Sequence, residues 1–357
     1  MRVINAITTF ALGVLCLGDA VAQRAEILQR VDLGKWGVGT AQFSGIVPMG
    51  NNVYAVVSDK EPTDGFFKMR IEINNLTGTV WGVGEVEFLG NPSPTRDASG
   101  NTTRDCEDVV FQPSTGTIFI SGEGDQQVLE YSPDGTPTGR ALAVPSIFAT
   151  NCIYPNMGFE ALAFHEETST FYTMTEGPLK KDGTPVGAAN PNGRNLLRLQ
   201  SYSSDLSAAE QYAYRSEGAE ITKRGTTYTF GVSAMTALTD GRLLVMEREL
   251  NVPQGHVGAT CIVRIFRVDP RHATPIAHDT DLSSLPDDAF LNKTEVFRHT
   301  TRFNLTTQTF ANYEGMCLGT PLADGTPTLL LISDSQGGYG NSLFRLKDYL
   351  LILALRE

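Results

Sequence analysis

The sequence predicts an all-β fold, and three features of the 357-residue chain support this prediction. Short runs of β-branched and other apolar residues recur along the chain, separated by Gly, Pro, Asp and Asn, which is typical of strands joined by turns. No long amphipathic helical pattern interrupts these runs. A four-residue motif also recurs at intervals of roughly 50 to 80 residues, so the chain is expected to repeat one structural unit.

The repeated motif begins each unit with an apolar residue, then Ser or Glu, then a small or acidic residue, then a second apolar residue. Its five copies are Phe43–Ile46, Cys106–Val109, Phe159–Leu162, Val232–Met235 and Tyr313–Met316. Units of this length with three or four strands are typical of the blades of a β-propeller, in which the first strand of each blade lines a central channel. A pair of β-sandwiches would not explain one motif at the same place in every unit.

Two further strands are expected in each unit. The second apolar run closes on an acid, and these runs span residues 56–59, 119–123, 172–176, 244–247 and 331–334. The third runs span residues 67–71, 128–131, 196–199, 262–265 and 343–346. There is room for a fourth strand between units. We therefore predict a five-bladed propeller, closed by a strand near 27–31 that pairs with the last blade, with a sixth, degenerate blade as the alternative.

The first residues of the chain indicate export. Arg2 precedes a mostly apolar stretch, and residues 20–22 have the small-x-small form of a signal-peptidase site. The apolar stretch is shorter than the roughly 20 residues that span a membrane. We predict a signal peptide at residues 1–22 and one propeller domain at residues 23–357. The mature protein is expected to be secreted or periplasmic, monomeric and without a membrane span.

Charge and cysteine content add two expectations. The formal net charge of −12 argues against a nucleic-acid partner, because binding phosphates requires a basic surface. Four cysteines remain after residue 22, and an even number in an exported chain is typical of disulfides. Our guess for the pairing is Cys106–Cys152 and Cys261–Cys317, because each pair would join neighbouring units.

The second residue of each motif is a candidate metal ligand, because the innermost strands of a propeller converge on its axis. The five residues are Ser44, Glu107, Glu160, Ser233 and Glu314. Three carboxylates brought together without a cation would repel one another. Calcium accepts six to eight oxygen ligands, including carboxylates and hydroxyls. The histidines share no common spacing, which disfavours zinc. The alternative is that these glutamates face solvent at the strand starts.

Two families resemble this pattern. The segments 107–111, 159–164 and 313–316, together with the acids that close the second runs, resemble the phytase-like family, which is named for esterase-like activity of phytases. The order Ser, Glu, Glu, Ser, Glu of the inner strands is similar to that of the calcium-activated nucleotidases, or apyrases, which are five-bladed propellers with a calcium ion on the axis. This resemblance implies that the five ring residues hold Ca²⁺. Asp59-Lys60 resembles the Asp-Arg pair of the nucleotidases, with Lys in place of Arg.

The resemblance implies calcium-dependent hydrolysis of a phosphoester or phosphoanhydride in a phosphorylated small molecule, at one mouth of the channel. The acids that close the second runs are candidate bases there: Asp59, Glu123, Glu176, Glu247 and Asp334. Of these we single out Asp59, Glu176 and Glu247 as catalytic residues. Lys60 and Arg248 each follow one of these acids and are expected to bind phosphate oxygens. The alternative function is a non-enzymatic binding propeller with a purely structural calcium ion.

Overall fold

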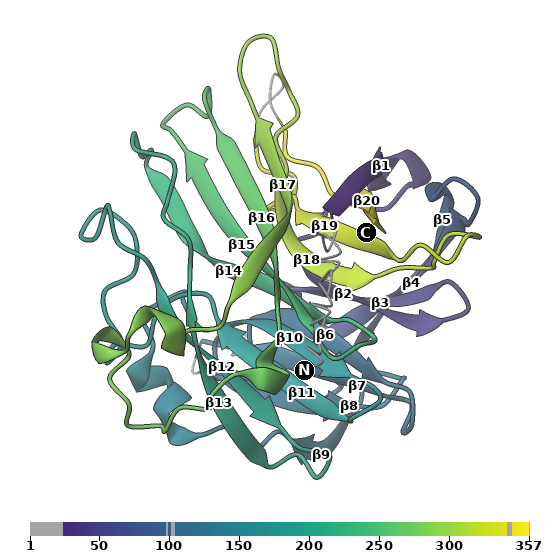
Figure 1. The fold of residues 1–357 in the computed structure, drawn as a ribbon. Coiled ribbons are helices and arrows are strands. Elements are labelled where there is room, and N and C mark those ends of the chain that lie inside the picture. The colour runs from purple at the N-terminus through teal and green to yellow at the C-terminus, as the bar shows by residue number, and fades with distance from the viewer. Residues whose placement is uncertain (1–23, 98, 101–103, 341–344, 357) are drawn as a thin grey trace, which may run out of the picture.

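The chain forms a ring of five antiparallel sheets, each with four strands (Figure 1). The computed structural model describes residues 24–97, 99–100, 104–340 and 345–356. The prediction of a five-bladed β-propeller is therefore confirmed. Within the described residues, none of the helices has the length and apolar character that crossing a membrane requires. The expected signal peptide at residues 1–22 lies outside the described residues.

Four blades consist of four consecutive strands, with the first strand innermost. Blade 1 contains β2 (Phe43–Gly50), β3 (Val53–Ser58), β4 (Gly65–Asn74) and β5 (Thr79–Gly90). Blade 2 contains β6 (Cys106–Gln112), β7 (Thr117–Gly122), β8 (Gln127–Tyr131) and β9 (Pro137–Ala141). Blade 3 contains β10 (Phe159–His165), β11 (Thr170–Thr175), β12 (Leu196–Tyr202) and β13 (Ala208–Arg215). Blade 4 contains β14 (Thr227–Ala237), β15 (Leu243–Val252), β16 (Thr260–Val268) and β17 (Lys293–Arg302).

The described helices are short 3₁₀ turns in the connections between strands. They are η1 (Leu33–Trp36), η2 (Ser146–Phe148), η3 (Thr150–Cys152), η4 (Pro270–His272), η5 (Leu282–Ser284) and η6 (Asp287–Ala289). Three of them begin at an Asp whose side chain accepts a hydrogen bond from the backbone of the first turn. These helices lie outside the sheets and leave the ring of blades uninterrupted.

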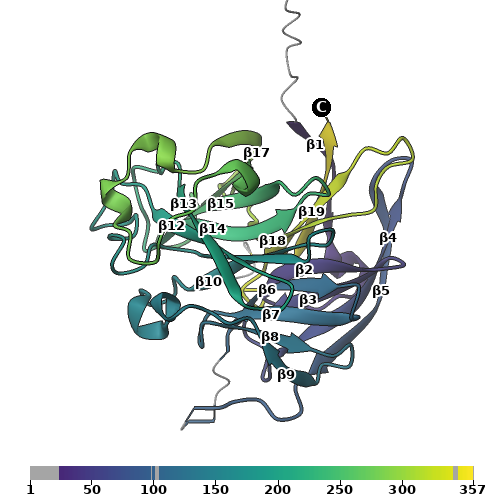
Figure 2. The same ribbon diagram turned by 60° about the horizontal axis from the view of Figure 1, so that its bottom comes forward.

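The N-terminal strand closes the ring through the last blade. Blade 5 contains β18 (Asn312–Leu318), β19 (Thr328–Asp334) and β20 (Tyr349–Arg356), and β1 (Arg24–Asp32) forms its outer edge. β1 pairs antiparallel with β20, so the end of the chain lies beside its first described strand (Figure 2). The predicted closure is confirmed. The third strand expected at 343–346 is wrong: residues 343–344 lie outside the described residues, and β20 is the strand that pairs with β19.

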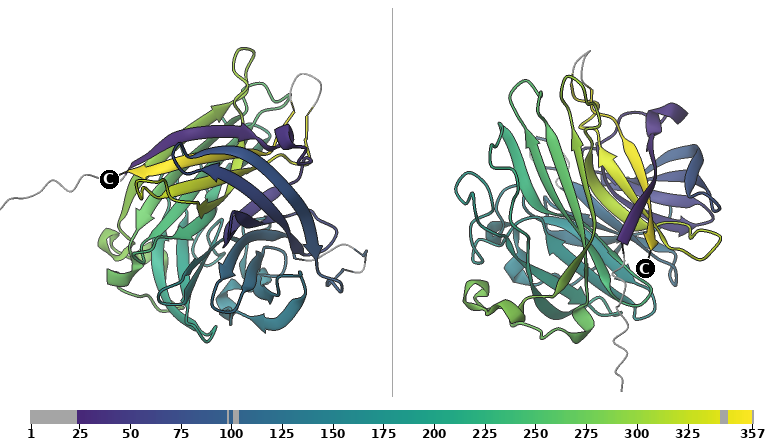
Figure 3. Two further views of the ribbon diagram at one scale, coloured as in Figure 1. Left: turned by 90° about the vertical axis from the view of Figure 1, so that its right-hand side faces the viewer. Right: turned by 45° about the horizontal axis from the view of Figure 1, so that its top comes forward.

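Each blade packs against its neighbours through apolar side chains that alternate along the strands. In β20, Leu351, Leu353 and Leu355 belong to the cluster shared with blade 4. Leu350 and Ile352 face the other way, into the cluster shared with blade 1. The green strands of blade 4 and the yellow strands of blade 5 accordingly lie side by side in both views of Figure 3. Burial on both faces explains why the terminal run Leu350–Leu355 is continuously apolar.

A β-bulge occurs at the repeated motif of every inner strand. In β2 the pairing passes from Phe43↔Ser58 to Gly45↔Val57, which leaves Ser44 as the extra residue. The same one-residue shift falls at Glu160, Ser233 and Glu314, and in β6 it falls between Cys106 and Val109. A bulge turns the extra residue out of the normal alternation of a strand. The motif therefore encodes the local geometry that directs its second residue toward the axis.

The predicted disulfides are absent from the structure, in which Cys106, Cys152, Cys261 and Cys317 are free. Cys106 packs in the cluster between blades 1 and 2, whereas Cys152 lies in η3, beyond blade 2 in the chain. Cys261 belongs to the cluster between blades 4 and 5, and Cys317 to the cluster between blades 5 and 1. The members of each guessed pair thus lie in different places. Burial raises the pKa of the Cys106 thiol to about 11 and that of Cys261 to about 12.

We predict that Gly45→Ala destabilises the ring, because no space exists for a side chain there. A Cβ atom at position 45 would lie 2.7 Å from the Cα of Asp108 and 2.8 Å from the carbonyl oxygen of Glu107. Both atoms belong to backbone of the neighbouring inner strand, so relief requires the strand to move. We expect a loss of about 1–3 kcal/mol in the free energy of unfolding, measured by urea denaturation. Gly39→Ala is the control, because a Cβ there meets nothing within 4 Å; equal stability of the two variants would contradict the prediction.

Candidate functional site

One cavity of about 570 Å³ opens over the ring residues at one end of the channel. Its floor includes Glu107, Glu160 and Glu314, and Arg248 lies beside them. Asp59 and Lys60 form part of its rim, because they follow directly after the end of β3. Three of the five predicted metal ligands therefore line this cavity. Of the five residues predicted to be catalytic or to bind substrate, Asp59, Lys60 and Arg248 line it as well.

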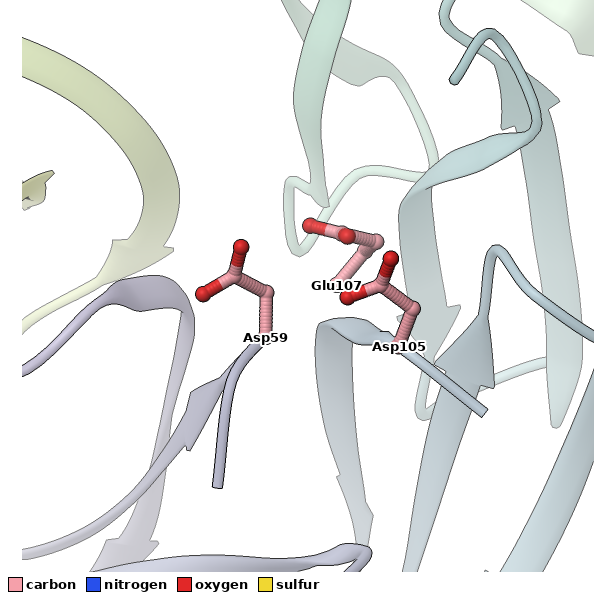
Figure 4. A group of neighbouring side chains, drawn as sticks. All are labelled: Asp59, Asp105 and Glu107. Carbon is pink, nitrogen blue, oxygen red and sulfur yellow. The ribbon is translucent and has the colours of Figure 1, made fainter. Parts of the chain in front are cut away.

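Buried and half-buried carboxylates lie around Glu107 in two overlapping groups. In the first group, one oxygen from each of Glu107, Glu123 and Glu160 lies within 4.8 Å of the others. In the second group, the same spacing joins Glu107 to Asp59 and Asp105. Figure 4 shows the second group, in which Asp59 extends from the end of one strand toward Asp105 and Glu107 at the start of the next. Glu107 is therefore the centre of the acidic cluster.

Burial disfavours the charged form of these acids. It raises the pKa of Glu107 and Glu160 well above their usual value, and the neighbouring carboxylates raise them further. The pKa of Glu123 rises to about 7, mainly through burial. The pKa of Glu314 rises to about 8, again mainly through burial, although the charge of Arg248 opposes the rise. The protein therefore holds several carboxyl groups that ionise at neutral pH only with additional positive charge nearby.

The two ring serines are buried without a partner. Ser44 is 2% exposed and Ser233 is 1% exposed, and within the described part of the chain neither Oγ has a hydrogen-bond partner. One oxygen of Glu176, Oε2, is also buried and without a partner in the same set of residues. A buried hydroxyl without a hydrogen bond is costly, and such groups usually indicate an ion or a water at the site.

Arg248 neutralises part of the ring. Its guanidinium forms ion pairs with Glu314 and with Glu176, the latter at 2.8 Å, and donates to the side chain of Asn312 at 3.3 Å. The Arg248 side chain is 5% exposed, so these pairs are shielded from water. Glu314 is thus paired with a protein cation, whereas Glu107 and Glu160 form a group with a third carboxylate, that of Glu123.

Glu247 does not belong to the cavity. Its carboxylate accepts hydrogen bonds from the hydroxyl of Tyr214 at 2.7 Å, the ammonium of Lys293 at 2.6 Å and the backbone N–H of Glu217 at 2.9 Å. The expectation that Glu247 and Arg248 face the same mouth fails, because β15 continues through both residues and successive side chains of a strand point to opposite faces. Arg248 faces the cavity, and Glu247 faces the contact between blades 3 and 4.

Lys60 occupies the rim as the partner of two acids. Its ammonium lies 2.8 Å from Asp59 and 2.7 Å from Asp105. Burial would lower the pKa of Lys60, but these two carboxylates outweigh it and raise the value. Burial also raises the pKa of Asp59, against the effect of Lys60. Lys60 therefore remains charged and shares its charge between the two sides of the rim.

Sequence reasoning missed two residues of this region. Asp105 precedes β6 and lies outside the repeated motif, so no periodic signal indicated it. Asp108 follows Glu107 and accepts hydrogen bonds at 2.8 Å from the backbone N–H groups of Val109 and Leu162, while a backbone hydrogen bond from Met235 also acts on its carboxylate. Asp108 thus joins three inner strands beneath the ring. The sequence did distinguish Asp108, because the other four copies of the motif carry Gly or Ala at the third position.

The donors at the ring fit a hard cation. Both acidic groups that meet the spacing of a metal site in the described chain consist of carboxylates alone, without His or Cys. The hydroxyls of Ser44 and Ser233 add neutral oxygens of the kind that calcium also accepts. Unsatisfied buried oxygens together with raised carboxyl pKa values are what a bound divalent cation would resolve. The residues present therefore fit calcium.

We predict that the calcium-free protein loses stability as pH rises. Glu123 and Glu314 hold protons in the folded state up to about pH 7 and 8, whereas in the unfolded chain they ionise near their usual 4.5. The folded state therefore binds more protons in this window, and the stability present below pH 4.5 is lost toward pH 8. Thermal melts in EGTA should fall on the order of 5 °C between pH 5 and pH 8. A midpoint that rises over this range would contradict the prediction.

Comparisons with known proteins give one family. Among solved structures, the catalytic domain of the GH62 α-L-arabinofuranosidase from Coprinopsis cinerea is 10% identical, with a TM-score of 0.41, over 93% of this chain and 96% of that one. An α-L-arabinofuranosidase from Lactobacillus brevis is 11% identical, with a TM-score of 0.43, over 88% and 91% of the two chains. A search of curated proteins finds no match. The model of the phytase-like family, described as esterase-like activity of phytase, matches residues 38–336. The chain therefore belongs to the phytase-like family.

Proposed function

We propose that this propeller is an exported, calcium-dependent phosphoester hydrolase that acts in the cavity above its ring. The observation that carries the proposal is the convergence of Glu107, Glu123 and Glu160 beneath an open cavity, together with ring-serine hydroxyls that are buried without a partner in the described residues. Membership of a family named for the esterase-like activity of phytase supports the class of reaction. An exported protein would also meet calcium at the concentrations that weak sites require.

The ring residues are the proposed calcium ligands. Glu107 and Glu160 would supply carboxylate oxygens, and Ser44 and Ser233 would supply hydroxyl oxygens. Glu314 is proposed to contribute from the far side of the ring, where Arg248 already balances its charge. Bound calcium would supply positive charge that polarises a phosphoryl oxygen and makes a bound water more acidic. Its charge would also allow the ring carboxylates to ionise at neutral pH.

The other residues of the cavity are proposed to bind the phosphate and accept a proton. Asp59 stands at the rim beside Glu107, where its carboxylate can take a proton from an attacking water. Glu176 is the second proposed base. It is buried beneath the cavity and does not line it, but Arg248 on the floor donates to one of its oxygens, and the other oxygen has no partner within the described residues. Lys60 and Arg248 are the cations that would orient phosphate oxygens. Glu247 has no role in this proposal, because its carboxylate faces away.

One observation favours a second candidate, a binding propeller with a structural calcium ion. Lys60 and Arg248 are each held by two carboxylates, so neither enters the cavity as an uncompensated charge. A site that only stabilises the ring needs calcium and these ion pairs, but it needs no proton acceptor. The two candidates differ in whether any phosphoester is turned over.

We predict calcium-dependent phosphate release by residues 23–357, and its loss in Glu160→Gln. The substitution keeps the shape of the side chain but removes one negative charge from the ring. Loss of a residue that only supports a metal ligand raises the Kd for the metal roughly tenfold or more, and loss of a ligand should cost more. We therefore expect the Kd for calcium to rise more than roughly tenfold, with a matching loss of activity at limiting calcium. Phosphate release from several phosphomonoesters, with calcium and with EGTA, measures the activity, and calorimetric titration measures the affinity.

Glu295→Gln is the matched control, because Glu295 is exposed on the outermost strand of blade 4. It should leave both the calcium affinity and the phosphate release unchanged. Calcium binding that raises the melting temperature without turnover of any phosphoester would favour the binding propeller over the hydrolase. If calcium changes neither the melting temperature nor the activity, the proposed metal site is refuted.

A further inference from the structure

We infer that the cavity selects esters that carry a single phosphate and an apolar organic group, and that it discriminates against densely phosphorylated compounds such as inositol hexakisphosphate. The inference rests on the proposed function, because it names the substrate class for the same cavity. It comes from the asymmetry of the cavity wall and from the distribution of charge around the floor.

One blade builds a wall that the other blades lack. The second strands of blades 1, 2, 3 and 5 end at the level of the ring, whereas β15 continues five residues beyond Glu247, to Val252. At about 3.3 Å per residue this extension rises on the order of 16 Å above the ring. Figure 1 shows the long strands β14, β15 and β16 of this blade side by side. The cavity is therefore bounded on one side by a hairpin.

Above Arg248, the cavity face of this hairpin carries two apolar side chains flanked by threonines. Arg248, Leu250 and Val252 alternate along β15 and all line the cavity, with Arg248 at the level of the floor. Thr229 and Thr227 of β14 pair with Leu250 and Val252, respectively, and line the same wall. These side chains offer methyl groups and hydroxyls, and Gln254 and His256 of the connection after β15 line the cavity beyond them.

The wall is anchored in the core between blades 4 and 5. Phe310 and Leu346 line the cavity and belong to this core cluster, and Leu250 and Val252 pack against the same cluster. An apolar surface that is supported from behind keeps its shape when the cavity is empty. Burying an apolar group of a ligand against it is favourable by roughly 25 cal/mol per Å² of surface removed from water.

The Lys and Arg side chains that line the cavity are already paired with carboxylates and leave little positive charge for more than one phosphate. Lys60 lies on the rim between two acids, and Arg248 lies on the floor between two others. Additional phosphates of a polyanion would lie against the apolar wall or against Asp59 and Glu160, where desolvation and like charge both oppose binding. An uncharged organic group has no such cost, so the wall suits the part of the substrate that leaves.

The reaction that fits this arrangement is the hydrolysis of a phosphomonoester. A bond forms between the water oxygen and phosphorus, while the bond from phosphorus to the ester oxygen breaks. The proton lost by the water is balanced by the proton gained by the ester oxygen. The products are inorganic phosphate and an alcohol or a phenol, and no oxidation or reduction takes place. The wall would hold the organic product until the ester bond has broken.

The test compares three substrates with residues 23–357 in calcium: 1-naphthyl phosphate, glycerol phosphate and inositol hexakisphosphate. We expect kcat/KM to be highest for 1-naphthyl phosphate, about tenfold above glycerol phosphate, and lowest for the hexakisphosphate. Val252→Thr should raise KM for 1-naphthyl phosphate about three- to tenfold, by a larger factor than it raises KM for glycerol phosphate. Val257→Thr is the control, because Val257 lies in the same hairpin, is 52% exposed and does not line the cavity.

Binding without turnover separates this inference from the proposed function. Calorimetric titration with 1-naphthylmethylphosphonate and with inositol hexakisphosphate, both in calcium, reports ligand preference even if nothing is hydrolysed. Tighter binding of the phosphonate without turnover of any ester would uphold the substrate class and refute the hydrolase. Calcium-dependent turnover with a preference for the hexakisphosphate would uphold the hydrolase and overturn this inference. Equal effects of Val252→Thr and Val257→Thr on KM would also overturn it.

Discussion

The register shift in each inner strand is the constraint on which the site depends. At the bulge, Ser44, Glu160, Ser233 and Glu314 each stand opposite a gap in the pairing, and the shift in β6 includes Glu107. Without the bulge, side chains would alternate strictly along the inner strand. The ring residue would then point into the contact between two blades, like the residues two positions before and after it. The small residues that follow, such as Gly45 and Gly315, allow the five inner strands to approach closely enough for the ring to form.

Convergence of the inner strands brings several carboxylates together, and their negative charge is balanced differently on the two sides of the ring. On one side, Arg248 balances Glu176 and Glu314 within the protein. On the other side, Glu107, Glu123 and Glu160 lie together, and burial raises the pKa of each of them. This unequal balance distinguishes the two sides of the ring, and the proposed calcium ion would compensate the side where Arg248 forms no ion pair.

The sequence was sufficient for the architecture, because the repeated motif reports both the period of the blades and the bulge. It also indicated Ser44, Glu107, Glu160, Ser233 and Glu314 as a ring, and the structure places Glu107, Glu160 and Glu314 at the floor of one cavity. The sequence could not show which of Glu247 and Arg248 faces the cavity, because this depends on whether β15 ends or continues at these residues. Asp105 could not be found either, because its approach to Asp59 depends on the packing of blade 2 against blade 1. The cysteine count suggested disulfides, but which cluster each thiol enters depends on which face of a strand it occupies.

A crystal structure of residues 23–357 grown with calcium chloride would test the central claim most directly. We expect an ion among Glu107, Glu160 and the neighbouring ring oxygens, with about six to eight oxygen ligands at about 2.3–2.6 Å, open on the side of the cavity. Lys60 and Arg248 should keep their ion pairs in that structure. A ring without a cation, in which Ser44 and Ser233 are satisfied by protein or water and the glutamates lie too far apart to share an ion, would contradict it.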